Sequence, residues 1–203
     1  MLSKTAIDLN KEVIDNITIT SHEAMIIKSI ESFYLNDNNS NIFINIITSV
    51  THISIRLIDY FITKYSKLHK ISYKYNDIVV NIYASYKQQL KAYQKRHFDP
   101  FSRGDRIPYF IKDTCIITTI GQLNFFKWFI SKNILEYIIN NQNAIENEMN
   151  YKNRIEKKLN KITKNIKVKK NKMAIYNKNI SYTGDNNYIT NTNNNISVIV
   201  SFN

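Results

Sequence analysis

Cysteine, glycine and proline are scarce in this chain, which has one, three and two of them among 203 residues. The single cysteine, Cys115, excludes an intramolecular disulfide framework and favours a reducing compartment. Its neighbours Thr114, Ile116 and Ile117 predict a buried thiol, because a reactive thiol needs an exposed, electropositive site. The few glycines form no loop of the kind that cradles phosphates.

Long apolar runs without charged residues are also missing. The first 15 residues, MLSKTAIDLNKEVID, contain no apolar stretch typical of a secretory signal. The most apolar stretch, residues 42–62, is interrupted by Asn45, His52, Arg56 and Asp59. A membrane span of about 20 residues tolerates few such groups, so we expect a core helix and no transmembrane segment.

No pattern of a known catalytic or metal site stands out. The four histidines are far apart, with no cysteine or acid at metal-ligand spacing. Asp99, Asp105 and Asp113 form the best acidic cluster for a metal-dependent nuclease, but arginines lie between them and favour ion pairs instead. We therefore expect no catalytic residues, no metal, no cofactor and no enzymatic activity.

Positive charge is abundant and unevenly distributed. The formal net charge is +12, and residues 151–178 hold eleven Lys or Arg against one acid, Glu156, which leaves about +2 for the rest of the chain. A basic helix of this kind favours a polyanionic partner. Alternatively, it is a solvated face, or a seam that packs on the body or on a second copy in an oligomer. The lysines expected to contact phosphates are Lys157, Lys158, Lys161, Lys164, Lys167, Lys169 and Lys170.

Hydrophobic spacing in the first half predicts helices. We expect them over about 3–16 and 21–35, the second capped by Ser21 with Met25 on its apolar face, and a linker over 35–41. The apolar spacing after Phe43 predicts one long helix to about residue 69, with a strand over 42–47 as the alternative. Asn76 and Asp77 are expected to cap the next helix, which must end before Pro100.

In the second half, Thr119 and Gln122 match a capping box that begins an aromatic helix. Lys132-Asn133 predicts a tight turn, followed by a helix to about Lys170. The apolar start of that helix, ILEYII, favours a packed helical hairpin over a DNA-reading helix-turn-helix. Residues 183–195 are predicted to be disordered, and ISVIVSFN is predicted to form a short strand.

These elements predict a mainly α fold: a compact multi-helix domain with a Pro/Arg-containing loop, a basic C-terminal helix and a short terminal β-strand. Four segments are expected: an N-terminal helical segment with its linker at 1–41, a core helical domain at 42–150, the basic helix at 151–178, and an Asn-rich tail with the strand at 179–203.

The segment KRHFDPFSRGDRIPYF at 95–110 holds both prolines and three of the five arginines: Arg96, Arg103 and Arg106. Because the chain otherwise uses lysine, these arginines indicate a need for a planar, bidentate cation. In a structural interpretation, Asp99 and Asp105 bind the arginines while Phe98 and Phe101 enter the core. In a functional one, the arginines converge on an external phosphate or on a partner's carboxylates. The structural interpretation is favoured, and the two can coexist.

Three segments resemble an uncharacterised protein family of the nucleocytoplasmic large DNA viruses, with similar stretches in chloroviruses and mimivirus-like viruses. They are ISIRLIDYFITKYSK at 53–67, YKQQLKAYQKRHFDPFSRGDRI at 86–107 and TTIGQLNFFKWFISKNILEYI at 118–138. The resemblance covers roughly residues 42–150. It implies a viral protein located in the host cell cytoplasm, at the virus factory, or in the virion, and it implies no activity.

We therefore expect a non-enzymatic viral protein that binds nucleic acid nonspecifically, or other polyanions, through the basic helix and the arginine-bearing loop. The alternative is a structural virion component, a minor capsid or core-associated protein, that acts through contacts with other viral structural proteins.

Overall fold

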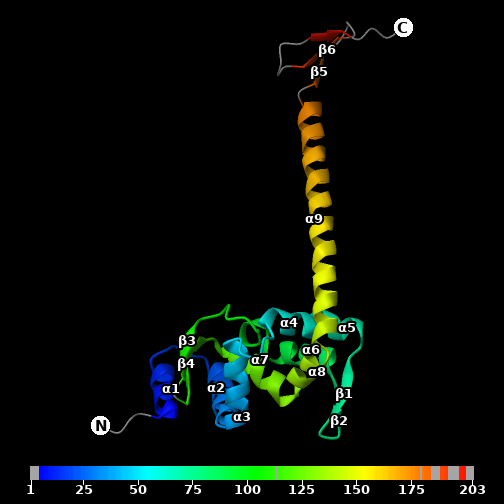
Figure 1. Cartoon of the computed structure of the whole chain (residues 1–203). Coiled ribbons are helices and arrows are strands. Elements are labelled where there is room, and N and C mark those ends of the chain that lie inside the picture. The colour runs from blue at the N-terminus through cyan, green and yellow to red at the C-terminus, as the bar shows by residue number, and fades with distance from the viewer. Residues whose placement is uncertain (1–4, 113, 179, 184–187, 192–196, 200–203) are drawn as a thin grey trace. The chain divides into compact units, whose positions relative to one another are not determined.

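The computed structural model of the protein describes the backbone of residues 5–112, 114–178, 180–183, 188–191 and 197–199, and the side chains as far as residue 163 except residue 113. The chain forms two units, residues 1–149 and 150–203, which are described separately. Figure 1 shows that most of the first unit is helical, as the sequence predicts. Its helices are α1 (Ala6–Asp15), α2 (Ser21–Tyr34), α3 (Asp37–Ile47), α4 (Ile55–Tyr60), α5 (Ser66–Leu68), α6 (Ile82–Tyr93), α7 (Ile120–Ser131), α8 (Ile134–Asn140) and the start of α9 (Gln142–Lys178).

Threonines begin the first two helices. Thr5 and Thr20 each accept a hydrogen bond from the backbone N–H three residues later, and the acids there, Asp8 and Glu23, accept one from the backbone N–H of the capping residue. Both predicted helices are confirmed, but the cap of α2 is Thr20 rather than Ser21. The expected orientation of Met25 is wrong, because its side chain is 73% exposed.

The expected linker at 35–41 is wrong because Asn36 begins a helix. Its side chain accepts hydrogen bonds from the N–H groups of Asn38 and Asn39, and α3 follows directly. Asparagine favours both turns and helix N-caps, so its local pattern does not distinguish a linker from a helix start.

The predicted long helix to residue 69 is interrupted, and the strand alternative at 42–47 is also wrong. Helix α3 ends at Ile47, Ser49 and His52 have positive φ of 62° and 56°, and Ser54 caps α4. A π-helical turn, Phe61–Tyr65, joins α4 to α5. Apolar spacing continues through the break because residues on both sides of it, such as Phe43 and Leu57, enter the same core.

Asn76 and Asp77 do not cap a helix. They are the turn of an antiparallel hairpin formed by β1 (Ser72–Tyr75) and β2 (Ile78–Asn81), with Tyr75 paired to Ile78. Both have positive φ, 48° and 62°, which suits the two-residue hairpin turns that Asn and Asp favour. The cap of α6 is Asn81, whose side chain accepts from the N–H of Ala84.

A second antiparallel hairpin was not expected from the sequence. It consists of β3 (Ile107–Ile111) and β4 (Thr114–Thr118), in a register that pairs Tyr109 with Ile116. Strand alternation turns Ile116 inward and Cys115 outward. The prediction of a buried thiol is therefore wrong, because Cys115 is exposed.

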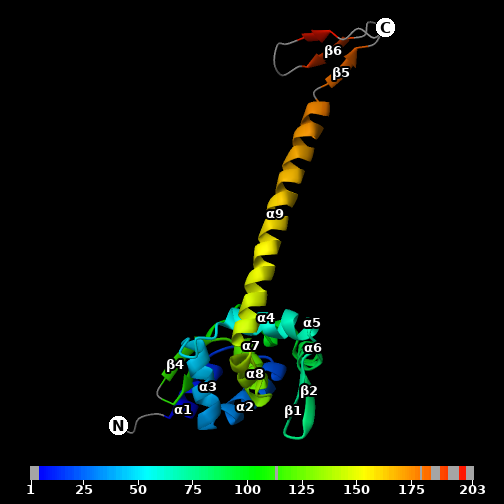
Figure 2. The same cartoon turned by 45° about the vertical axis from the view of Figure 1, so that its right-hand side comes forward.

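Helix α7 is the centre of the first unit, and Figures 1 and 2 show it beside α2 and α3. Thr119 caps it as predicted, by accepting from the N–H of Gln122. The helix is apolar on nearly all sides, which is typical of a buried helix. Its side chains that are at most 1% exposed are Leu123, Phe125, Phe126 and Phe129. Each such side chain contributes roughly 2–3 kcal/mol by burial.

The predicted turn at Lys132-Asn133 is confirmed, with Asn133 in the left-handed region. The helix that follows is interrupted at Asn141, between α8 and α9. Ile134 and Ile138 of α8 are fully buried, which agrees with a packed helical hairpin.

The second unit consists of the remainder of α9 and an antiparallel three-stranded sheet. Its strands are β5 (Ile180–Thr183), β6 (Tyr188–Asn191) and β7 (Ser197–Ile199). The expected terminal strand is confirmed for Ser197–Ile199. The expected disorder of residues 183–195 is wrong for Tyr188–Asn191, where a short run with Tyr, Ile and Thr has β propensity despite its Asn-rich surroundings. None of the helices described is long and apolar enough to span a membrane.

Candidate anion-binding site at the arginine loop

The arginine loop, residues 94–106, connects α6 to β3 and lies against the N-terminus of α7. Gln94, with φ 58°, ends α6, and a 3-10 turn, Lys95–His97, follows. The N–H of Asp99 donates to the carbonyl of Gly121 at 3.2 Å. A Cβ at Gly121 would lie 2.7 Å from the carbonyl oxygen of Arg96, so only glycine lets the loop approach α7 this closely.

Polar side chains of α7 bind the loop backbone. The Gln122 amide donates to the carbonyl of Pro100 at 2.8 Å, and its oxygen accepts from the hydroxyls of Ser102 and Thr118. Asn124 donates to the carbonyl of His97 at 3.0 Å. Gln122 and Asn124 are both buried, so these hydrogen bonds satisfy groups that water cannot reach. They fix the loop as a rigid support for its arginines.

Arg103 is held on two sides. Its Nε donates to Asp99 Oδ2 at 2.8 Å and its Nη2 to Asp99 Oδ1, which makes a bidentate pair. Its guanidinium carbon also lies 4.9 Å from the centre of the Phe101 ring. The hydrogen bonds to Asp99 raise the pKa of Arg103. The Arg103 side chain nevertheless remains 58% exposed, whereas that of Asp99 is 11% exposed.

The two loop phenylalanines differ in burial. Phe98 is 1% exposed and lies among Tyr86, Phe125 and Trp128, as the structural interpretation predicts. Phe101 is only half-buried, and the guanidinium of Arg103 lies over its ring. One ring therefore holds the loop in the core, and the other supports a cation at the surface.

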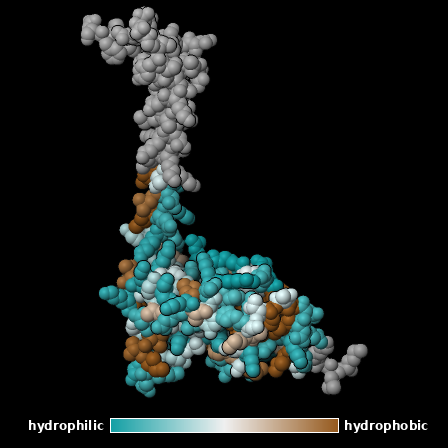
Figure 3. Space-filling view, turned by 180° about the vertical axis from the view of Figure 1, so that it is seen from behind, coloured by the Kyte–Doolittle hydropathy of each residue, from teal (hydrophilic) through white to brown (hydrophobic). Residues whose placement is uncertain are grey.

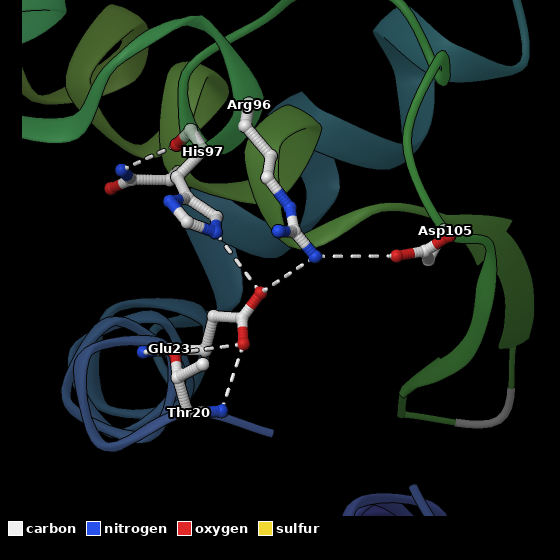
Figure 4. A network of polar contacts seen from close by, with 6 residues as sticks. Thr20, Glu23, Arg96, His97 and Asp105 are labelled. Carbon is white, nitrogen blue, oxygen red and sulfur yellow. Dashed lines mark hydrogen bonds and ion pairs between the residues drawn. The ribbon is translucent and has the colours of Figure 1, made fainter. Parts of the chain in front are cut away.

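Arg96 has looser partners. Its Nη2 lies 3.8 Å from Glu23 Oε1 and 3.6 Å from Asp105 Oδ2, and its side chain is 67% exposed. Figure 4 shows the same Glu23 oxygen facing His97 Nε2, at 3.0 Å, while the other carboxylate oxygen accepts from Thr20. The backbone hydrogen bond from Thr20, followed by contacts with the Thr20 hydroxyl and His97, lowers the pKa of Glu23 from 4.5 to about 2. This network attaches the start of α2 to the loop.

A cavity of about 390 Å³ opens beside these arginines. It is lined by Lys95, Arg96, Asp99, Phe101, Arg103, Gly104 and Thr119. Three cations face it against one acid, and that acid is already paired with Arg103. The arrangement suits an anion. Arg106 does not line this cavity but is also exposed, and no side chain among the described residues pairs with it.

The acids considered for a nuclease do not converge in the described part of the chain. Asp99 is paired with Arg103, and Asp105 is 97% exposed and contacts Arg96. Asp113 lies outside the described residues. No group of three His, Cys, Asp or Glu side chains that could hold a metal ion is found among the residues described.

The predicted phosphate-binding lysines of the basic helix lie on α9. Lys157, Lys158 and Lys161 are exposed, whereas the side chains of Lys164, Lys167, Lys169 and Lys170 lie outside the described residues. Figure 3 shows hydrophobic side chains along the described part of α9, where Ile155, Leu159 and Ile162 are 39%, 57% and 55% exposed. Ile145, earlier on the same helix, is in contrast fully buried in the first unit.

Sequence reasoning missed the residues that position the loop: Glu23, His97, Gly121, Gln122 and Asn124. Two of them carried a readable signal, since Glu23 stands at the capping-box position after Thr20 and Gln122 at that position after Thr119. The side chain of Gln122, however, binds the loop instead of completing the capping box. His97 and Asn124 had no local signal, because their partners lie far away in the sequence.

The sequence matches the model of a family of unknown function (DUF7197) over residues 4–203. It is also similar to the uncharacterized protein L507 of Acanthamoeba polyphaga mimivirus, with 31% identity over 168 residues, which cover 73% of this chain and 64% of that protein. The chain thus spans somewhat less than two thirds of the length of this relative. No solved structure matches. The resemblance to giant-virus proteins is confirmed, and the match to the family extends beyond residues 42–150 to nearly the whole chain.

Proposed function

Because the chain belongs to the DUF7197 family, which has no assigned activity, its function must be inferred from its own residues, and we propose that it binds nucleic acid nonspecifically. In this proposal the arginine loop contacts phosphates and bases, and the lysines of α9 add nonspecific affinity for the backbone. No catalytic step is involved.

The observation that carries the proposal is the exposed, fixed guanidinium of Arg103. Asp99 and Phe101 hold it in place without covering it, and Lys95 and Arg96 line the same cavity. Unstacked bases pack on arginine planes and aromatic rings, while neighbouring cations bind the phosphates. This arrangement favours single-stranded over double-stranded nucleic acid, because only unstacked bases reach the guanidinium face.

The basic helix supports the same proposal by its charge. Its exposed lysines would release counterions from a nucleic-acid backbone, which makes binding strongly dependent on salt. Such contacts carry no sequence information, so we expect little preference among sequences.

Fluorescence anisotropy with a labelled single-stranded 20-mer and the matching duplex tests the proposal. We expect salt-sensitive binding, tighter to the single strand, and a loss of about 1–3 kcal/mol in Arg103→Ala if a base stacks there. Arg103→Lys keeps the charge but loses the planar fork, so it should recover only part of the affinity. Arg56→Ala removes the same charge from an exposed position on α4 and serves as the control. Absence of salt-sensitive binding, or full affinity in a chain that lacks residues 150–203, would refute the proposal.

A second function is favoured by the exposed apolar residues of α9. Ile155, Leu159 and Ile162 follow one another at helical spacing and are exposed, as in a helix that docks on a neighbouring protein. A structural virion component, a minor capsid or core-associated protein, would use them against other viral structural proteins. Quantitative mass spectrometry of purified virions separates the two: abundant copies favour the structural role, and absence favours a role in the host cytoplasm at the virus factory.

A further inference from the structure

A second cavity, of about 450 Å³, lies between α1, the C-terminal half of α2 and β3, and shares no lining residue with the arginine-loop cavity. Figure 1 shows α1 beside the β3–β4 hairpin. The Asn10 side chain joins them, because it donates to the carbonyl of Phe110 at 2.8 Å and accepts from its N–H at 2.7 Å. The walls are therefore held in place, and the volume is in the range of small-molecule sites.

Most of the wall is apolar and incompletely covered. Ile7 from α1 and Leu35, at the end of α2, both line the cavity and are 57% and 64% exposed. Tyr34 and Ile111 line it as buried residues. An apolar ligand body would remove this surface from water, which favours binding by about 25 cal/mol for each Å² buried.

Among the polar groups that line the cavity are a tyrosine hydroxyl and a carboxyl group without a hydrogen-bond partner in the described part of the chain. Tyr109 is only 4% exposed, and neither its hydroxyl nor the carboxyl group of Glu31 has a hydrogen-bond partner there. Both side chains line this one cavity. Burial raises the pKa of both groups, and the Glu31 charge raises that of Tyr109 further. The other tyrosine, Tyr34, is already used, since its hydroxyl donates to the carbonyl of Leu123 at 3.0 Å.

The charged groups at the rim of the cavity indicate the sign of the charge that a ligand would carry. Lys112 is paired with Asp37 at 3.0 Å, so it does not neutralise Glu31. Lys28, one turn before Glu31 on α2, is exposed and has no partner among the described residues. The carboxylate of Glu31 is thus the deeper charged group, and it lacks a fixed counter-charge.

We propose that this cavity binds a small organic amine: an ammonium group that donates to the Glu31 carboxylate and the Tyr109 hydroxyl oxygen, attached to an apolar body that covers Ile7 and Leu35. The ammonium supplies the missing counter-charge, and a charge-assisted hydrogen bond to a partly buried carboxylate is among the stronger ones. A carboxylate ligand would be repelled by Glu31, and a neutral alcohol would leave the charge of the Glu31 carboxylate uncompensated.

Isothermal titration of the full chain with 3-phenylpropylamine, 3-phenylpropan-1-ol and 3-phenylpropanoate tests this. We expect the amine to bind about tenfold more tightly than the alcohol, since hydrogen bonds to charged groups exceed neutral ones by about that factor, and the acid to bind most weakly. Glu31→Gln should abolish the preference for the amine, and Tyr109→Phe should weaken amine binding severalfold.

Several controls keep the result interpretable. Lys28→Ala should leave amine binding unchanged or strengthen it, because it removes the mobile cation that competes for Glu31. Arg56→Ala should have no effect, and the thermal midpoint of each variant checks that it is folded. Equal binding of the three compounds, amine binding unaffected by Glu31→Gln, or no binding of any of them at millimolar concentration would each overturn the proposal. None of these outcomes depends on nucleic-acid binding.

Discussion

The arginine loop and the basic part of α9 both present cations, but they hold them differently. In the loop, Arg103 is fixed by Asp99 and Phe101, and the backbone beneath it is bound by Gln122. On α9, Lys157, Lys158 and Lys161 are exposed on a helix with only Glu156 as a nearby acid in sequence. A fixed cation loses little conformational entropy when a ligand binds, whereas a mobile lysine contributes mainly charge. The loop is therefore suited to recognising the geometry of a ligand, and the helix is suited to attracting a polyanion over a longer distance.

The largest expected difference between the two regions is in stability. Phe98→Ala should lower the free energy of unfolding by about 3–5 kcal/mol, because it leaves a cavity in the aromatic core beneath the loop. Leu159→Ala, on the exposed face of α9, should change it by less than about 0.5 kcal/mol. Urea denaturation followed by Trp128 fluorescence measures both, and equal effects would mean that the loop is not held by its buried ring.

Gly121→Ala tests whether the loop depends on its close approach to α7. The added Cβ would meet the Arg96 carbonyl at 2.7 Å, so we expect a loss of about 1–3 kcal/mol as the backbone shifts. The matched control is Gly104→Ala, since a Cβ there meets nothing nearer than 3.9 Å. Thermal denaturation distinguishes them, and comparable stability of the two variants would contradict this packing.

Acid should loosen the loop through Glu23. The pKa of Glu23 is about 2 in the folded protein, against an ordinary 4.5, because the backbone N–H and hydroxyl of Thr20 and the ring of His97 bind its carboxylate. The depressed pKa means that this stabilisation is complete above pH 4.5 and is lost as the pH falls from 4.5 towards 2. Unfolding free energies measured across this interval should fall less steeply in Glu23→Gln. An identical pH profile in the two proteins would show that the network contributes nothing.

The smallest effect is expected on α9. Lys158→Gln should leave stability unchanged and reduce the salt dependence of nucleic-acid binding, lowering the slope of log K against log salt by about 0.7–0.9 if one phosphate contact is lost. Lys11→Gln on α1 makes the same change at another exposed position and is the control. Anisotropy titrations at several salt concentrations measure the slopes. Equal slopes for the two variants would show that α9 does not contact the nucleic acid.

Local signals predicted the start of α7 and the binding of a loop arginine by Asp99, because each depends on residues at most four positions apart. The Lys132-Asn133 turn and the first two helices were predictable for the same reason. Their hydrogen bonds close within one helical turn, so composition and spacing determine them.

Other features depend on which segments of the chain pair with one another, and in which register. Asn76-Asp77 fits a helix start or a hairpin turn, and only the pairing of β1 with β2 decides between them. Cys115 is exposed because β4 pairs with β3 in one register, and a shift by one residue would turn it inward.

Neighbouring residues and composition account for the helical character of the chain, the Thr119 cap of α7 and the basic segment. Long-range packing, in contrast, brings Glu23 to His97 and Arg96 across more than 70 residues, places Gln122 against the loop, and brings Tyr109 and Glu31 to one cavity. Contacts between distant segments depend on how the core packs, and that packing selects one of many arrangements that local patterns allow equally.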